Sequence, residues 1–187
     1  PEVKLGLLPG GGGTQRLPRL IGIQAAVPLI LEGRRLDATQ AKTLGILDAL
    51  VPAGTEVQAA RAWVLGAAAA GFQQPWDRKG YKVPGGAVSS PALQQFFMAA
   101  NAMLRRKTFG NLPNLRDALS CVYEGLQTDL DTGLAVERRY FVKAVLSPEG
   151  KAMIRTLFFG PQRAGKVDGE GAKPAPMTRI GVLGAGM

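Results

Sequence analysis

"PEVKLGLLPGGGGTQRL", residues 1–17, joins one acid, a short apolar run and four consecutive glycines. The apolar run before the glycines predicts a short strand or extended segment. Gly10–Gly13 permit backbone angles that other residues avoid, and they let another group approach the chain closely. Thr14 is a suitable residue to cap a helix, which we expect over 15–21. The stretch therefore predicts that Glu2 lies near a turn with little side-chain cover.

Most of the remaining chain predicts helices, because apolar residues recur at three- to four-residue spacing. Helices are expected over 24–31, 38–44 with a capping box of Asp37 and Gln40, 56–70 and 90–107. Further helices are expected after Asp129 and after caps at Asn114 and Ser147. The apolar stripe expected on the 90–107 helix consists of Leu93, Phe96, Phe97, Ala100, Met103 and Leu104. A second short strand is expected at 46–51 and a long loop at 71–90.

The end of the chain predicts a linker followed by a new domain. Gly160-Pro161 is expected to end a helix whose Met153, Ile154, Leu157 and Phe158 face inward. Residues 160–178 have few bulky apolar side chains and predict a linker. "RIGVLGAGM", residues 179–187, predicts a strand and turn, in which Gly184 and Gly186 fit the first two glycines of the G-x-G-x-x-G dinucleotide motif.

Composition excludes several classes of chemistry. The 187-residue chain has no histidine, which removes histidine bases, histidine metal sites and Ser-His-Asp triads, so we expect no metal site. Its one cysteine, Cys121, predicts a buried structural thiol and a reducing, cytoplasmic compartment, with an organellar matrix or peroxisome as alternatives. No apolar run is long enough to predict a membrane span.

The basic balance of the chain favours an anionic partner without identifying it. The net charge is +9, spread over short clusters of lysine and arginine. Aromatic residues do not alternate with these clusters, so we expect no nucleic-acid binding. The glycine run is not a phosphate-binding loop, because Gly13 is followed by Thr14-Gln15 where Lys-Ser/Thr is required.

Residues 1–17, together with "GRRLDATQAKTLGILDALV" at 33–51, resemble the enoyl-CoA hydratase (crotonase) family. The order of a crotonase segment, helices, a linker and a Rossmann-like start resembles multifunctional enzymes of fatty-acid β-oxidation, which also carry an NAD-dependent 3-hydroxyacyl-CoA dehydrogenase. The resemblance implies an α/β family in which this segment is predominantly helical. It divides the chain into the end of a crotonase-like domain (1–70), a loop and helical region (71–159), a linker (160–178) and a truncated Rossmann domain (179–187).

The resemblance also implies roles for individual residues. Glu2 matches the second of two glutamates that share acid/base catalysis in hydration, or that move a proton in double-bond isomerisation. Gly10 matches a glycine whose backbone N–H lies at the reacting centre, and Gly184 and Gly186 are implied to bind NAD. A coenzyme A thioester is the implied substrate, and a thiolase or a second copy of the chain is an implied partner.

Two other interpretations stay open at this point. The isolated segment is expected to be inactive, because the family's first glutamate and oxyanion hole are expected before Pro1, and it would then act only as a helical binding or assembly module. A single-function enoyl-CoA isomerase relative is the other alternative, since isomerisation needs only one acid.

Overall fold

Helices make up the regular structure of the chain, as the apolar spacing predicts. This computed structural model describes residues 1–166, 179 and 181. The first half contains the 3₁₀ turn η1 (Glu2–Leu5) and helices α1 (Gly13–Ile21), α2 (Ile23–Glu32), α3 (Ala38–Thr43) and α4 (Glu56–Ala69). The second half contains the 3₁₀ turn η2 (Pro75–Asp77) and helices α5 (Pro91–Thr108), α6 (Pro113–Gly125), α7 (Leu130–Leu146), α8 (Pro148–Met153), the π-helical η3 (Ile154–Phe159) and α9 (Gly160–Ala164).

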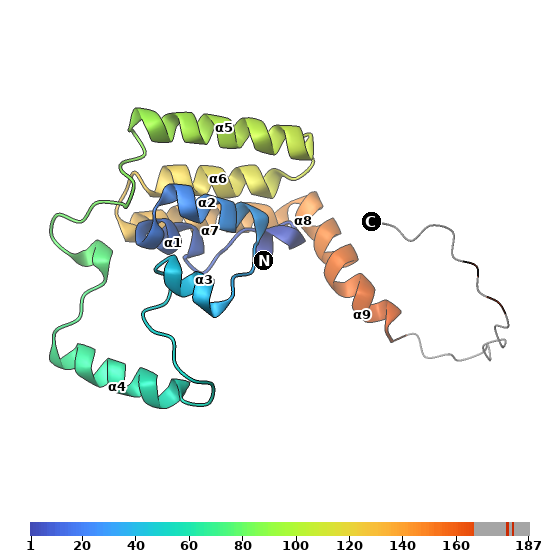
Figure 1. Cartoon of the computed structure of the whole chain (residues 1–187). Helices are drawn as coiled ribbons and strands as arrows, with labels where there is room; N and C mark the ends of the chain where they lie inside the picture. The colour runs from blue at the N-terminus through green and yellow to red at the C-terminus, as the bar shows by residue number, and fades with distance from the viewer. Residues whose placement is uncertain (167–178, 180, 182–187) are drawn as a thin grey trace.

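Helix α6 lies at the centre of a bundle and contacts α1, α2, α5 and α7 (Figure 1). Its apolar face is fully covered, because Ala118 and Val122 are at most 1% exposed. The buried apolar core consists of Leu8, Ile23, Ala26, Val27, Ile30, Val88, Leu93, Phe97, Ala100, Ala118, Leu119, Val122 and Ala144. Burial of this surface on both sides of α6 joins the first 32 residues of the chain to the helices after residue 90.

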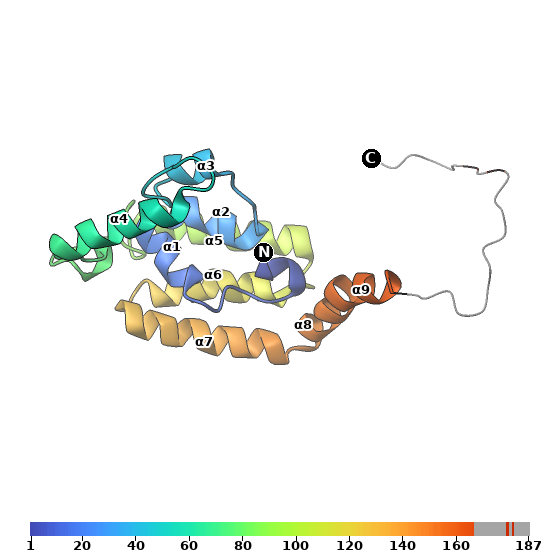
Figure 2. The same ribbon diagram turned by 90° about the horizontal axis from the view of Figure 1, so that it is seen from below.

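Helix α4 stands apart from this bundle in Figure 1, although it overlaps the bundle in projection in Figure 2. Its apolar side chains remain accessible, with Val57 78% and Leu65 63% exposed. The ring of Trp63 packs edge-on against the ring of Phe72, with 5.1 Å between the ring centroids. The predicted loop at 71–90 is confirmed apart from η2, and it leads the chain back to α5.

Both predicted strands are wrong, since no strand occurs among residues 1–166. Glu2–Leu5 forms a 3₁₀ turn that ends at Gly6 in the left-handed conformation. Residues 46–51 form turns and bends. A short apolar run is compatible with either structure, and here no neighbouring strand within the described chain offers backbone hydrogen bonds to either segment.

Helix starts were predicted well where a side chain acts as cap. Asp37 and Gln40 form the expected capping box, and Asp129 and Ser147 accept hydrogen bonds from the first turns of α7 and α8. Thr14 does not cap α1, which begins at Gly13, two residues before the expected start, with Gly12 as N-cap. Asn114 does not cap α6 either; it lies inside the helix, whose first residue is Pro113.

The C-terminal helices differ from the prediction in two respects. Leu157 and Phe158 are 54% and 46% exposed rather than buried. Earlier in the chain, Met103 of the predicted apolar stripe on α5 is also 52% exposed. Gly160-Pro161 does not end the helical run, because α9 follows η3 directly. The rest of the predicted linker and the predicted Rossmann start fall outside the described residues, except for Arg179 and Gly181.

None of the helices among the described residues is both long enough and apolar enough to cross a membrane.

Candidate functional site

Glu2 opens η1 and keeps its carboxyl group partly accessible, with 44% of the side chain exposed. The carboxylate pairs with the Pro1 ammonium at 3.1 Å. Partial burial raises the pKa of this carboxyl. A hydrogen bond from its own backbone and the Pro1 ammonium lower the pKa by a larger amount, so the net pKa lies below the ordinary value. Glu2 is therefore an ionised and reachable carboxylate at neutral pH.

The turn that carries Glu2 packs closely against α8. A Cβ atom at Gly6 would lie 2.9 Å from the Cα of Gly150 and 3.0 Å from the sulfur of Met153. The φ of Gly6 is +78°, which adds backbone strain to any larger residue. A glycine is thus required where η1 ends, for space and for conformation.

Gly10 begins the glycine turn and lies against an aromatic ring of α7. A Cβ atom at Gly10 would meet the ring of Phe141 at 2.6 Å. The ring therefore approaches the bare backbone directly. None of the hydrogen bonds found within residues 1–166 joins Glu2 to Gly10.

A buried carboxylate from α7 holds the other end of the glycine turn. Glu137 is 1% exposed and accepts hydrogen bonds from the backbone N–H of Gly12, from the backbone N–H of Thr14 at 2.9 Å, and from the Thr14 hydroxyl. A helix N-terminus has unpaired N–H groups and a positive dipole end, which a carboxylate satisfies. Glu137 thus caps α1 from 123 residues away.

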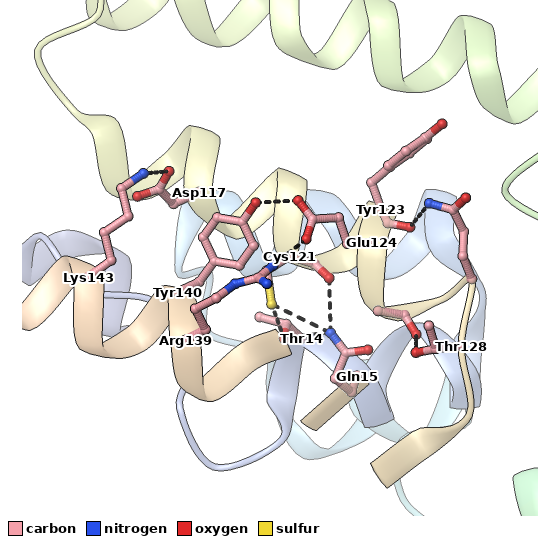
Figure 3. A network of polar contacts seen from close by, with 12 residues as sticks. Thr14, Gln15, Asp117, Cys121, Tyr123, Glu124, Thr128, Arg139, Tyr140 and Lys143 are labelled. Atoms are coloured by element: carbon pink, nitrogen blue, oxygen red, sulfur yellow. Dashed lines mark hydrogen bonds and ion pairs between the residues drawn. The ribbon is translucent and has the colours of Figure 1, made fainter. Parts of the chain in front are cut away.

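Gln15 and Arg19 continue this polar network into the bundle (Figure 3 shows Gln15). Gln15 is fully buried and donates to the Cys121 carbonyl at 3.1 Å. Arg19 is 4% exposed and donates to the Gln15 side chain at 3.0 Å and to the carbonyls of Gly125 and Thr128 at 2.9 Å. These bonds tie α1 to the C-terminal end of α6, where carbonyls lack helical partners.

Gly125 and Gly133 leave the space that the Gln15 side chain occupies, and a substitution at one of them tests this packing. A Cβ atom at Gly125 would lie 2.2 Å from the Gln15 side-chain oxygen, which its hydrogen bonds hold in place. We expect Gly125→Ala to lower the free energy of unfolding by about 1–3 kcal/mol through overpacking. Gly66→Ala on α4 is the matched control, because no atom lies within 4 Å of its Cβ position. It should raise stability by about 1 kcal/mol through helix propensity. Urea unfolding of both variants checks the opposite signs, and equal effects would contradict the packing argument.

Cys121 is the buried thiol that the sequence predicts. It is 0% exposed and lies 3.1 Å from the Thr14 hydroxyl. Burial is the main cause that raises its pKa, with smaller contributions from the negative charges of Glu137 and Glu124, and the value reaches about 11. The thiol is therefore protonated at neutral pH and is not a nucleophile.

The raised pKa of Cys121 predicts a loss of stability at high pH. The unfolded thiol ionises above an ordinary pKa of 9.0, while the folded thiol stays protonated until about pH 11. The unfolded state thus releases its proton first, and stability should fall by about 3 kcal/mol between these two pH values. Urea unfolding from pH 8 to 11, compared with Cys121→Ala, isolates this contribution. An identical pH dependence in the variant would contradict it.

Acid and base side chains of α6 and α7 pair on the outer face of this network (Figure 3). Lys143 lies 2.7 Å from the nearly buried Asp117, and Arg139 lies 2.6 Å from Glu124. Tyr140 donates its hydroxyl hydrogen to Glu124, and burial together with this bond raises the pKa of Tyr140 to about 12. These pairs hold α7, and with it Glu137 and Phe141, against α6.

The sequence did not reveal the residues that support the predicted site. Glu137, Gln15 and Arg19 are buried polar side chains whose partners lie 100 or more residues away in several cases. Spacing along the chain carries no signal for such contacts. Gly184 and Gly186 lie outside the described residues, and residues 1–166 hold no cluster of acidic or cysteine side chains that could bind a metal ion.

The chain is similar to known proteins in the segment that carries Glu2 and the glycine turn. Residues 1–71 match the enoyl-CoA hydratase/isomerase family. This hydratase/isomerase segment contains η1, α1 to α4 and both predicted site residues, Glu2 and Gly10. The predicted resemblance of this segment to the crotonase family is thereby confirmed.

Relatives extend the similarity beyond the hydratase/isomerase segment to the whole chain. The fatty acid oxidation complex subunit alpha of Vibrio cholerae is 37% identical over 198 aligned residues. The subunits of the same name from Vibrio vulnificus and Vibrio campbellii are 38% identical over 187 residues. Each match covers 100% of this chain and 26% of the relative, so the chain spans about a quarter of the length of these curated relatives. The predicted resemblance to a multifunctional β-oxidation enzyme is confirmed for this portion.

Proposed function

We propose that the chain is part of an enzyme of fatty-acid β-oxidation that hydrates trans-2-enoyl-CoA to 3-hydroxyacyl-CoA. The observation that carries this proposal is the similarity of all 187 residues to alpha subunits of fatty acid oxidation complexes, with the hydratase/isomerase match at residues 1–71. The accessible, ionised Glu2 at the start of the hydratase/isomerase segment supports it.

Hydration adds the oxygen of water to C3 of the unsaturated thioester and a proton to C2. We assign Glu2 as one of two carboxyl groups that share the transfer of these protons. The same carboxylate can move a proton between C4 and C2, which shifts a 3-enoyl double bond to position 2. Where another residue precedes Pro1, the Pro1 nitrogen is an amide without charge, and the Glu2 carboxylate is released from its ion pair for this role.

The backbone at Gly10 is assigned to bind the substrate. The exposed position of Gly10 leaves its N–H approachable, while Phe141 fills the space where a side chain would lie. The carboxylate of Glu137 fixes the end of the same turn. The basic surface of the chain, with its net charge of +9, suits the three phosphates of coenzyme A.

The intact protein is also proposed to oxidise the 3-hydroxyacyl-CoA product, with NAD as the hydride acceptor. Gly184 and Gly186 are the residues of this chain that would contact the dinucleotide. We also propose that the intact protein associates with a thiolase or with further copies of itself in a reducing compartment. The relatives in Vibrio species are named as alpha subunits of a complex, which supports association with another subunit.

An assay with crotonyl-CoA tests the proposed function. The intact protein that contains this segment should hydrate crotonyl-CoA, measured as the loss of absorbance from the conjugated thioester. The isolated 187-residue chain should show no hydration above the buffer control. Absence of hydration by the intact protein would overturn the proposed function, and hydration by the isolated chain would overturn the expectation that this segment is incomplete.

A further inference from the structure

We propose that Asn114 is a positioning residue that holds the Glu2 turn in place for hydration, an inference that rests on the proposed function. Asn114 lies in the first turn of α6 and is 3% exposed. Its side-chain amide donates hydrogen bonds to the carbonyl of Val3 at 3.0 Å and to the carbonyl of Leu7 at 2.8 Å. One amide group thus binds the backbone on both sides of the end of η1.

The turn held by Asn114 has little stability of its own. It consists of four residues, and the bonds around its ends run from Lys4 N–H to Pro1, from Gly6 N–H to Glu2 and Val3, and from Leu7 N–H to Glu2. A single helical turn is unfavourable in water, because it fixes several residues for few hydrogen bonds. The position of the Glu2 backbone therefore depends on contacts from other elements.

Those contacts come from α2, α6, α8 and η3. Asn114 of α6 binds its carbonyl groups, while Gly150 and Met153 of α8 contact Gly6. Val3, next to Glu2, is 4% exposed and anchors the turn in the apolar interior. Glu2 alone among the first three residues carries a charged side chain, and its backbone is held by α6 and α8 together with α2 and η3.

The chemistry of Asn114 indicates that its two N–H groups are the reason for an amide at this position. Its Oδ1 atom is buried and has no hydrogen-bond partner among the described residues. A buried acceptor without a partner costs about 1–3 kcal/mol. Retention of an amide despite that cost points to its donors, which aspartate would lack and leucine could not replace. Aspartate would also place a carboxylate against two carbonyl oxygens.

The test compares Asn114→Asp with Asn111→Asp in the intact protein. Asn111 is an exposed residue of the loop before α6 and serves as the matched control. We expect Asn114→Asp to lower the kcat for crotonyl-CoA hydration by about 10²-fold with KM changed less than threefold, because a small misplacement of a catalytic group has effects of this size. Asn111→Asp should leave both constants unchanged. Dehydrogenase activity and the circular dichroism spectrum report that each variant is folded.

A double-mutant cycle with Glu2→Gln separates positioning from a general structural role. If Asn114 acts through Glu2, Asn114→Asp should lower hydration less than twofold further when Glu2 is already replaced. Hydrogen exchange adds a readout that does not depend on activity: the amides of Gly6 and Leu7 should exchange at least about tenfold faster in Asn114→Asp, because the turn opens more often. If Asn114→Asp does not fold, Asn114→Ser, which keeps one donor, replaces it in the same cycle with an intermediate effect expected.

The outcomes distinguish this inference from the function on which it rests. Near-normal hydration by Glu2→Gln would overturn the assigned role of Glu2, and the positioning role with it. Loss of hydration in Glu2→Gln with an unchanged kcat in the Asn114 variants would overturn the inference alone. Multiplicative losses in the double mutant would also overturn it, since Asn114 would then act independently of Glu2.

Discussion

Glu2→Gln in the intact protein should lower the kcat for enoyl-CoA hydration by about 10²- to 10⁴-fold, the range typical for removal of a general acid or base. Glutamine keeps the shape of the side chain and can form hydrogen bonds, but it cannot exchange a proton with substrate at neutral pH. Because the charge is lost and the turn is retained, KM should change much less than kcat. Crotonyl-CoA hydration at several substrate concentrations gives both constants.

Two internal controls accompany this variant. The dehydrogenase activity of the same protein should survive, which shows that the loss is confined to hydration. Glu56→Gln removes an exposed carboxylate from α4, which stands apart from the bundle, and should leave hydration unchanged. If Glu2→Gln retains hydration comparable to Glu56→Gln, Glu2 is not the acid/base group.

Glu137→Ala should cause the largest loss of stability among single substitutions in the polar network, about 3 kcal/mol. It would leave two buried backbone N–H groups and the Thr14 hydroxyl without their acceptor, and each unsatisfied buried group is costly. It would also leave a cavity between α1 and α7. Urea unfolding followed by circular dichroism measures the change, with an unchanged m-value as the sign that the two-state transition is retained.

Matched variants identify which property of Glu137 matters. Glu137→Gln keeps an acceptor oxygen and the side-chain volume, so about half of the destabilisation should be recovered. Asp131→Ala removes an exposed acid from the first turn of the same helix, and its cost should stay below about 1 kcal/mol. Equal effects of Asp131→Ala and Glu137→Ala would show that the glycine turn does not depend on this buried carboxylate.

The sequence predicts the helices of the bundle better than the contacts between them. Local signals suffice for the capping box at Asp37 and for the starts of α5, α7 and α8 after Ser90, Asp129 and Ser147. The short apolar runs at 2–9 and 46–51 misled the prediction, because strand formation depends on a partner strand that a single segment cannot reveal. Asn114 was mistaken for a cap, since its residue type fits that role and its distant carbonyl partners leave no trace in the local pattern.

The candidate site was predicted in part. Glu2 and Gly10 were singled out by resemblance, and the structure shows an accessible carboxylate and a bare backbone at these positions. Their supports, Asn114, Glu137 and Phe141, were not predicted. Each acts across more than 100 residues of chain, and a buried acid such as Glu137 looks in the sequence like any acid on an amphipathic helix.

The support of residues 1–17 by helices α6 to α8 has a consequence for protein engineering. A chimera joined at residue 71, where the family match ends, would take Glu2 and the glycine turn from one parent and residues 114, 137 and 150 from another. In such a hybrid the Glu2 turn would lose these supporting contacts unless the second parent supplied the same three residues. An exchange between relatives without this mismatch therefore has to include the helices up to the end of η3 at Phe159, which also contacts the Glu2 turn.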